Sequence, residues 1–186
     1  WQWEGQSQEA NRYNIDDLKL VYLSLQRALA AANLHQSVQI DAAEIVEYGA
    51  ALSDKSKIGF DGAAFSSGMN NKGYGVYKNY IEELLVSAQM RDIIGNHLSM
   101  HGYFSDAEFS RMGELRSLVW QEVQKVSPGA RIWMSEFCIL GEAGDTRPFT
   151  GTGFAVDDME YALHVGKVIH RDLTRLNASA WHWWLA

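Results

Sequence analysis

Residues 132–140 have the sequence Ile-Trp-Met-Ser-Glu-Phe-Cys-Ile-Leu, and this stretch decides the fold class. It is a short, mostly apolar run without regular alternation of polar and apolar side chains. Such a run is typical of a strand that is buried on both faces. Pro128-Gly129 ends a helical pattern just before it. Strands buried on both faces belong mainly to parallel sheets, so the run predicts an α/β protein.

Helical and strand patterns alternate on both sides of this run. Apolar residues spaced three and four apart predict helices over residues 18–32, 77–88, 105–126 and 159–176. The third helix is expected to begin at Ser105, which has capping-box spacing to Glu108, and Asp157 is expected to cap the fourth. Further strands are predicted at residues 38–46, 93–103 and 178–186. The resulting order, α-β-α-β-α-β-α-β, predicts a parallel sheet with right-handed crossovers.

Two architectures fit this order: a doubly wound sheet and a slice of a (β/α)8 barrel. No glycine-rich phosphate loop follows any predicted strand, which disfavours a nucleotide-binding sheet. Long connections at residues 49–75 and 141–155 follow strands, whereas the connections leading into strands are short. In a barrel, the loops that follow the strands build the active-site face. The loop lengths therefore favour the barrel.

Composition narrows the function. The chain has 186 residues, enough for one domain, and a net charge of −7, so nucleic acid and anionic membranes are poor partners. Cys138 is the single cysteine, which excludes an internal disulfide and a cysteine-based metal site. His97 and His101 lie four residues apart, but no further ligands cluster with them, so no metal is expected. Seven tryptophans suit either a sugar-binding cleft or a core rich in aromatic residues.

Chemistry-bearing side chains occur near the predicted carboxyl ends of the strands. They include Glu44, His101, Tyr103, Glu136 and the tryptophans of residues 181–184. A carboxylate with a histidine, a tyrosine and tryptophans favours a site that hydrolyses sugars, in which two carboxylates share the acid, base and nucleophile roles. The alternative is that Glu136 is a strand-end partner of a salt bridge.

Four stretches resemble glycoside hydrolase family 30, a retaining family of clan A. Residues 133–141, Trp-Met-Ser-Glu-Phe-Cys-Ile-Leu-Gly, resemble its nucleophile strand, and residues 99–103, Ser-Met-His-Gly-Tyr, resemble its strand six. Residues 1–5 and 168–184 resemble its strand-four loop and its helix seven with strand eight. The resemblance covers essentially the whole chain and is closest to members acting on β-1,6-galactans. It implies that residues 1–186 are the C-terminal half of a TIM barrel, strands five to eight.

The resemblance also implies roles for particular residues. Glu136 would be the nucleophile that forms a covalent glycosyl-enzyme intermediate. The positions that match residues lining the family's sugar subsites are His101, Tyr103, Trp183, Trp181, Trp3 and Glu44. The family's acid/base glutamate would precede Trp1, and neither Glu4 nor Glu9 matches its Asn-Glu-Pro motif.

The expected function is that of a retaining O-glycoside hydrolase acting on a β-linked, plant-type polysaccharide similar to β-1,6-galactan, without a cofactor. Both ends of the chain are bulky and apolar, which predicts a fragment of a longer protein without the N-terminal half-barrel and the family's accessory β-sandwich. The fragment is expected to be inactive alone and to pair with the rest of its barrel or with itself. The resemblance implies a secreted, periplasmic or cell-surface protein. The alternatives are a non-catalytic carbohydrate-binding protein and, less favoured, a nucleotide-dependent enzyme.

Overall fold

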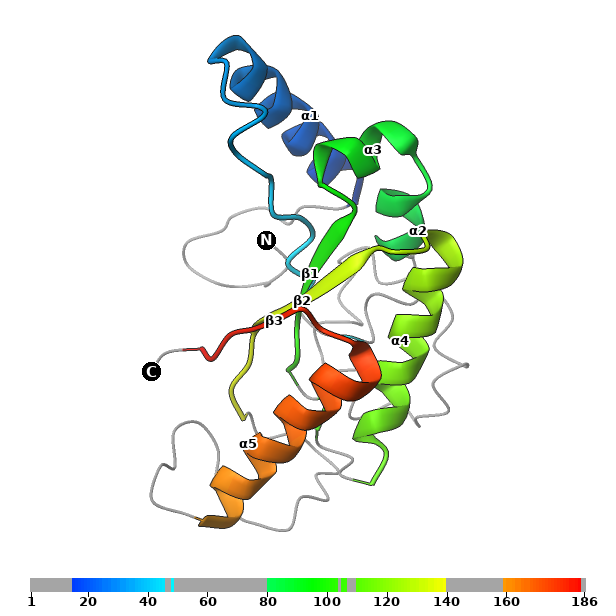
Figure 1. The fold of residues 1–186 in the computed structure, drawn as a ribbon, viewed down its shortest axis with the longest axis vertical. Helices are drawn as coiled ribbons and strands as arrows, with labels where there is room; N and C mark the ends of the chain where they lie inside the picture. The colour runs from blue at the N-terminus through cyan, green and yellow to red at the C-terminus, as the bar shows by residue number, and fades with distance from the viewer. Residues whose placement is uncertain are drawn as a thin grey trace.

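A computed structural model describes residues 15–45, 48, 80–103, 105–106, 110–139 and 159–184. Helices and parallel strands alternate along these residues, and Figure 1 shows helices α4 and α5 running beside the sheet. The elements are α1 (Ile15–Ala31), α2 (Tyr80–Leu85), α3 (Ala88–Ile93), β1 (His97–His101), α4 (Met112–Val126), β2 (Arg131–Glu136), α5 (Met159–Arg171), the π-helix η4 (Asp172–Leu176) and β3 (Ala180–Trp181).

The sheet has the order β1-β2-β3, and both neighbouring pairs are parallel. Leu98 pairs with Ile132, and Met134 pairs with Trp181. The prediction of an α/β fold with parallel strands adjacent in chain order is therefore confirmed for these strands. Leu98, Met100, Ile132 and Met134 are fully buried in the core that the helices share, so we call their side of the sheet the helix face. The opposite side, which carries Ser99, His101 and Ser135, is the inner face.

The strand predicted at residues 38–46 is wrong as a regular strand. Ala43 and Glu44 have φ angles of 85° and 44°, which break the extended backbone. Ile45 nevertheless forms an isolated parallel bridge to Met100. Its N–H donates to the Ser99 carbonyl at 3.1 Å, and its carbonyl accepts from the His101 N–H at 2.7 Å. The segment thus lies beside β1, where the first of the four predicted strands was expected, and the positive φ angles at Ala43 and Glu44 interrupt it.

The helix predicted at residues 77–88 is also wrong in extent. The described residues form two short helices, α2 and α3, which are separated at Val86 and Ser87. The Ser87 hydroxyl caps α3 by accepting from the Met90 N–H at 3.4 Å. Because α3 continues to Ile93, β1 begins at His97, four residues later than predicted.

The capping box predicted at Ser105 does not start α4. The helix begins at Met112, and Arg111 at its N-cap makes no side-chain cap hydrogen bond. Ser105 lies in a turn, where its hydroxyl donates to the Gly102 carbonyl at 2.5 Å and accepts from Arg116 at 3.0 Å. This serine serves the packing of α4 against the end of β1 instead.

The predicted apolar stripe of the last helix is only partly buried. Met159, Leu163 and Leu173 belong to that stripe, yet they are 71%, 59% and 48% exposed. The residues that α5 and η4 bury are Tyr161, His164, Val168, Asp172 and Leu176. The helix thus turns a partly polar face inward. Of the strand predicted at residues 178–186, the described part, 178–184, contains the two-residue strand β3.

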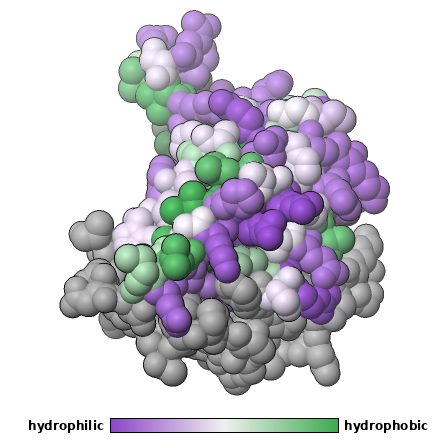
Figure 2. Space-filling view, turned by 60° about the horizontal axis from the view of Figure 1, so that its bottom comes forward, coloured by the Kyte–Doolittle hydropathy of each residue, from purple (hydrophilic) through white to green (hydrophobic). Residues whose placement is uncertain are grey.

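Hydrophilic side chains predominate on the side of the molecule shown in Figure 2, with apolar ones scattered between them. The apolar side chains exposed along α5 contribute to such a mixed surface. None of the helices in the described part of the chain has the length and apolarity that a bilayer-spanning segment needs.

Candidate active site

Glu136 reaches the inner face because β2 contains a β-bulge. Met100 pairs with Met134, but the next residue, His101, pairs with Glu136, so Ser135 is an extra residue in β2. Without it, alternation would direct Glu136 to the helix face, together with Met134. The bulge moves Glu136 to the same side as His101, which is a recurrent use of bulges near active sites. No pattern in the sequence predicted this bulge.

His101 lies between two carboxylates. Its Nε2 is 2.6 Å from Oε2 of Glu44, a hydrogen bond in which the imidazole donates, and its Nδ1 is 3.7 Å from Oε1 of Glu136. The Ser135 hydroxyl also donates to Oε2 of Glu44, at 3.0 Å. The side chain of Glu136 is 13% exposed and that of Glu44 is 44% exposed, whereas His101 is buried. We call Glu44, His101, Tyr103, Ser135 and Glu136 the Glu136 cluster.

Tyr103 binds Glu136 directly. Its hydroxyl donates a hydrogen bond to Oε1 of Glu136, and its ring meets that of His101 edge to face at 5.7 Å. Burial, and after it the hydrogen bond to Glu136, raises the pKa of Tyr103 well above its ordinary value. The phenol therefore stays protonated and acts as a fixed donor to one oxygen of Glu136.

Two neighbouring carboxyls in this region have pKa values shifted in opposite directions. Burial alone would raise the pKa of Glu44, but the hydrogen bond and charge of His101, with the Ser135 hydroxyl, lower it below its ordinary value. Burial, supported by the charge of Glu44, raises the pKa of Asp41 despite the hydrogen bond from Ser99. Glu44 is therefore the member of the pair that is ionised more readily.

His97 lies at the other end of β1 from His101 and belongs to a second group, with Asp41 and Trp133. Its Nε2 is 3.4 Å from Oδ1 of Asp41, and its ring packs on that of Trp133 at 4.4 Å. Burial lowers the pKa of His97, which favours the neutral imidazole. Within the described ranges, no group of three or more histidine, cysteine, aspartate or glutamate side chains could hold a metal ion.

Trp181 and Trp183 form a stacked pair, with ring centroids 6.0 Å apart and an angle of 27° between the planes. The ring of Phe137 contacts both, at 6.0 and 6.1 Å. The indole N–H of Trp181 donates to Oδ2 of Asp172 at 2.9 Å, so this ring is anchored in the helix layer. Because the N–H of residue 184 donates to the Phe137 carbonyl at 2.9 Å, the pair is tied to the residue that follows Glu136.

The structure thus brings together four of the predicted site residues, Glu44, His101, Tyr103 and Glu136, and joins the other two described ones, Trp181 and Trp183, to each other. Trp3 lies outside the described residues, as do the connections at residues 49–75 and 141–155. Ser135 and Asp172 were not among the residues predicted from the sequence. Ser135 lies inside the quoted strand motif, but only the bulge makes its hydroxyl face Glu44.

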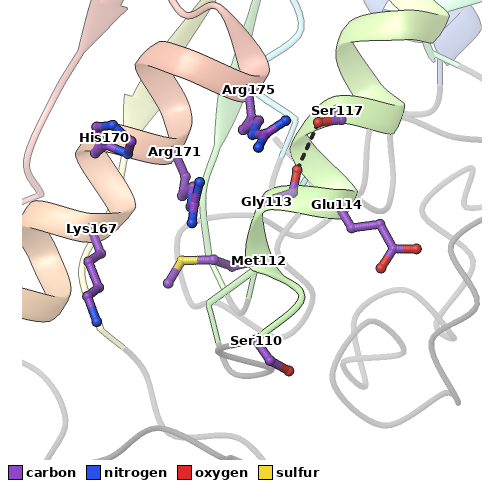
Figure 3. A pocket seen from close by; sticks show the side chains of 9 residues that line it. All are labelled: Ser110, Met112, Gly113, Glu114, Ser117, Lys167, His170, Arg171 and Arg175. Carbon is purple, nitrogen blue, oxygen red and sulfur yellow. Dashed lines mark hydrogen bonds between the residues drawn. The ribbon is translucent and has the colours of Figure 1, made fainter.

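A separate pocket of about 460 Å³ lies between α4 and the α5–η4 segment. Figure 3 shows Lys167, Arg171 and Arg175 on the side opposite Met112 and Gly113, at the start of α4. Three of its nine lining residues are cationic, Lys167, Arg171 and Arg175, and none of the nine is a predicted site residue. The pocket is therefore distinct from the Glu136 cluster.

Comparisons with known proteins identify the family of the chain and a solved structure of similar fold. The model of the family described as O-glycosyl hydrolase family 30 matches residues 1–186. A solved structure, described as a conserved exported protein from Bacteroides fragilis, is similar in fold, with a TM-score of 0.71 and 22% sequence identity. The similarity covers 99% of this chain and 34% of that chain, so this chain spans about a third of the other's length. No curated protein matches significantly. Because the family model extends over every residue, the chain belongs to O-glycosyl hydrolase family 30.

Proposed function

We propose that this chain supplies the nucleophile of a retaining O-glycoside hydrolase, and that Glu136 is that nucleophile. The observation that carries the proposal is the placement of Glu136 at the end of β2, beside His101 and in a hydrogen bond with Tyr103. A retaining mechanism needs a carboxylate that is held in one orientation and attacks the anomeric carbon. Tyr103 binds Oε1 and leaves Oε2 as the attacking oxygen.

The remaining members of the Glu136 cluster orient the site. Glu44 accepts hydrogen bonds from His101 and from the Ser135 hydroxyl. Ser135 thus holds the carboxylate of Glu44, and Glu44 holds the imidazole of His101. The Nδ1 edge of the imidazole of His101 in turn lies near Oε1 of Glu136. Glu44 is exposed enough to contact a sugar hydroxyl as well, since a carboxylate accepts up to four hydrogen bonds.

The fold that supports this chemistry is the C-terminal half of a (β/α)8 barrel, with the described sheet as its later strands. In such a barrel the reacting groups gather at the carboxyl ends of the strands, where Glu136 and His101 lie. The family resemblance predicts the acid/base glutamate on strand four, ahead of Trp1. It would lie about 5–5.5 Å from Glu136, the separation that retention requires.

The proposed substrate is a β-linked polysaccharide similar to β-1,6-galactan, bound against the ring of Trp183, with Trp3 at a neighbouring position. Trp181, whose indole N–H is bonded to Asp172 on the helix face, supports the ring of Trp183. Indole faces suit the C–H face of a pyranose. The proposed location is secreted, periplasmic or cell-surface. The 186-residue chain by itself is expected to lack turnover, because general acid catalysis typically contributes about 10²–10⁴-fold and the predicted acid lies outside it. Its expected partner is the remainder of the barrel.

The test is azide rescue of Glu136→Gly in the intact enzyme. With an activated β-aryl galactoside, azide enters the space left by the carboxylate, attacks the anomeric carbon and releases the phenol. The α-glycosyl azide is the expected product, because a single displacement inverts the configuration. Glu44→Gly is the matched control, and azide should yield no glycosyl azide there.

Other outcomes would overturn the assignment. A β-configured azide product from Glu136→Gly would make Glu136 the acid/base residue. A Glu136→Gln variant as active as wild type would make Glu136 structural. If the wild-type enzyme binds galactan without cleaving any aryl glycoside, the protein is the carbohydrate-binding alternative.

A further inference from the structure

Asp172 is a fully buried carboxylate at the start of η4, and its two oxygens have different partners. Oδ1 accepts from the Tyr48 hydroxyl and from Nε of Arg116, both at 2.7 Å. Oδ2 accepts from the indole N–H of Trp181 at 2.9 Å. We call Tyr48, Arg116, Asp172 and Trp181 the Asp172 network. One oxygen is thus engaged in a buried ion pair, and the other holds an aromatic ring.

Arg116 compensates the charge of Asp172. It is fully buried, and its guanidinium also donates to the carbonyls of Met112 and Ser105, at 2.8 and 3.2 Å. Its carbon Cζ lies 5.1 Å from the centroid of the Tyr48 ring, within cation–π range. Arg116 and Tyr48 donate to Oδ1 and not to Oδ2. The hydrogen bond that the indole of Trp181 donates to Oδ2 can therefore be changed separately.

The backbone of Asp172 also controls where β3 begins. Its carbonyl accepts from the N–H groups of Asn177 and Ala178, and Asn177 adopts a left-handed conformation with φ 55°. These bonds end the π-helix three residues before β3. Single π-helical turns of this kind are frequent at functional sites. Both the main chain and the side chain of Asp172 therefore position the segment that carries Trp181.

We propose that Asp172 is a positioning residue for the stacked pair of Trp181 and Trp183: through the indole N–H of Trp181, it holds that ring against Trp183. The stacked geometry of the two indoles, and the contact of Phe137 with both, make the orientation of Trp183 depend on Trp181. The inference rests on the proposed function only where it assigns Trp183 to sugar binding. The anchoring itself is independent of any substrate.

The test uses Asp172→Asn in the intact enzyme and the far-ultraviolet exciton couplet that two stacked indoles give in circular dichroism. Asparagine keeps an oxygen toward the Arg116 cation, so its NH2 group faces the indole N–H and two donors meet. The expected result is loss of the couplet. Trp183→Phe gives the circular-dichroism spectrum expected when the stacked indole pair is absent. Tyr48→Phe is the matched control, because it removes a bond to Oδ1 and should leave the couplet intact.

A couplet that survives Asp172→Asn, or that Tyr48→Phe diminishes equally, would overturn the proposal. If Asp172→Asn does not fold, hydrogen exchange of the Trp181 indole N–H in the wild-type chain decides. Strong protection supports the anchor, and exchange at the rate of an exposed indole overturns it.

The affinity of the intact enzyme for β-1,6-galactotetraose distinguishes a failure of the Asp172 anchor from a failure of the proposed sugar-binding role of Trp183. Asp172→Asn should weaken binding in wild type but not in a Trp183→Ala background, because the effect passes through Trp183. If Trp183→Ala itself leaves the affinity unchanged while the couplet behaves as expected, the sugar assignment fails and the anchor stands.

Discussion

The Glu136 cluster and the Asp172 network combine the same kinds of side chain on opposite faces of one sheet. Each pairs a carboxylate with a nitrogen-bearing side chain and a tyrosine hydroxyl. On the helix face, Arg116 and Asp172 are 0% exposed, and the guanidinium is bonded through all three nitrogens. On the inner face, Glu44 is 44% exposed, and Nδ1 of His101 has no hydrogen-bond partner among the described residues.

The difference separates structural from chemical use of the same groups. A buried polar network that is fully satisfied makes one geometry rigid, because breaking any bond leaves a desolvated group without a partner. A partly open cluster keeps acceptors and donors available for a ligand. The Asp172 network therefore suits support of the fold, and the Glu136 cluster suits contact with a substrate.

Arg116→Met should break the Asp172 network most severely. It leaves the charge of Asp172 buried without its cation, so the free energy of unfolding should fall by about 3–5 kcal/mol. Urea denaturation of the chain measures this. Arg111→Met is the matched control, because Arg111 binds Glu114 on the surface, and its effect should stay within about 0.5 kcal/mol. Similar losses from both variants would contradict the distinction.

Tyr48 and Tyr103 allow a direct comparison of the Asp172 network with the Glu136 cluster. Tyr48→Phe withdraws a donor from a fully buried carboxylate and should cost about 1.5–3 kcal/mol, as a hydrogen bond to a charged group does. Tyr103→Phe withdraws a donor from Glu136, which water can reach, and should cost about 1 kcal/mol. Denaturation midpoints of the two variants give the order. An equal or larger loss for Tyr103 would show that the inner face is as closed as the helix face.

Gly102 lies where the two regions meet. A Cβ atom there would be 2.9 Å from Cδ2 of Phe137 and 3.5 Å from the Tyr48 hydroxyl, so Gly102→Ala should destabilise the chain by about 1–3 kcal/mol. Gly166, within α5, has nothing within 4 Å of its added Cβ. Gly166→Ala should therefore stabilise by about 0.5–1 kcal/mol through helix propensity. Thermal unfolding of both variants should show shifts of opposite sign, and shifts of the same sign would refute the packing argument.

Glu44→Gln should give the smallest effect, visible in the pH dependence. The folded-state pKa of Glu44 is lowered, so its stabilisation is full above its ordinary pKa of about 4.3 and is lost as pH falls through the folded value. The variant should be less stable than wild type above about pH 5 and equal to it in strong acid. Asp41→Asn is the opposite control: the raised pKa of Asp41 means that wild type loses stability as pH rises, and the variant should not. Unfolding temperatures across this pH range test both signs.

Periodicity predicted the elements whose contacts are local or uniformly apolar. The core of α1, the later part of α4 and the strand around Met134 lie where the sequence pattern placed them. The pattern placed the helix of residues 159–176 correctly but did not identify its buried side, because α5 and η4 bury polar groups. His164 lies 2.7 Å from Asp106, and Asp172 binds Arg116, so a search for apolar residues selected the exposed side. Buried polar pairs depend on partners far away in the chain, which periodicity does not register.

The candidate site was predictable in its residue types but not in its geometry. Glu136, His101 and Tyr103 follow from the family resemblance, and their proximity requires two local irregularities. The positive φ angles at Ala43 and Glu44 bring Glu44 to His101, and the bulge brings Glu136 to Tyr103. Both depend on hydrogen bonds between separate segments, so no single stretch of sequence encodes them.

The bulge at Ser135 makes the number of residues in β2 as important as their identity. Replacing Ser135 by alanine removes one hydroxyl and leaves the spacing intact. Deleting it would restore regular alternation and turn the carboxylate of Glu136 by half a rotation, toward the core between sheet and helices. Substitution scanning would therefore rate residue 135 as tolerant, whereas a scan of single-residue deletions would identify it as a spacer whose loss turns Glu136 away from the site without changing any of the proposed site residues.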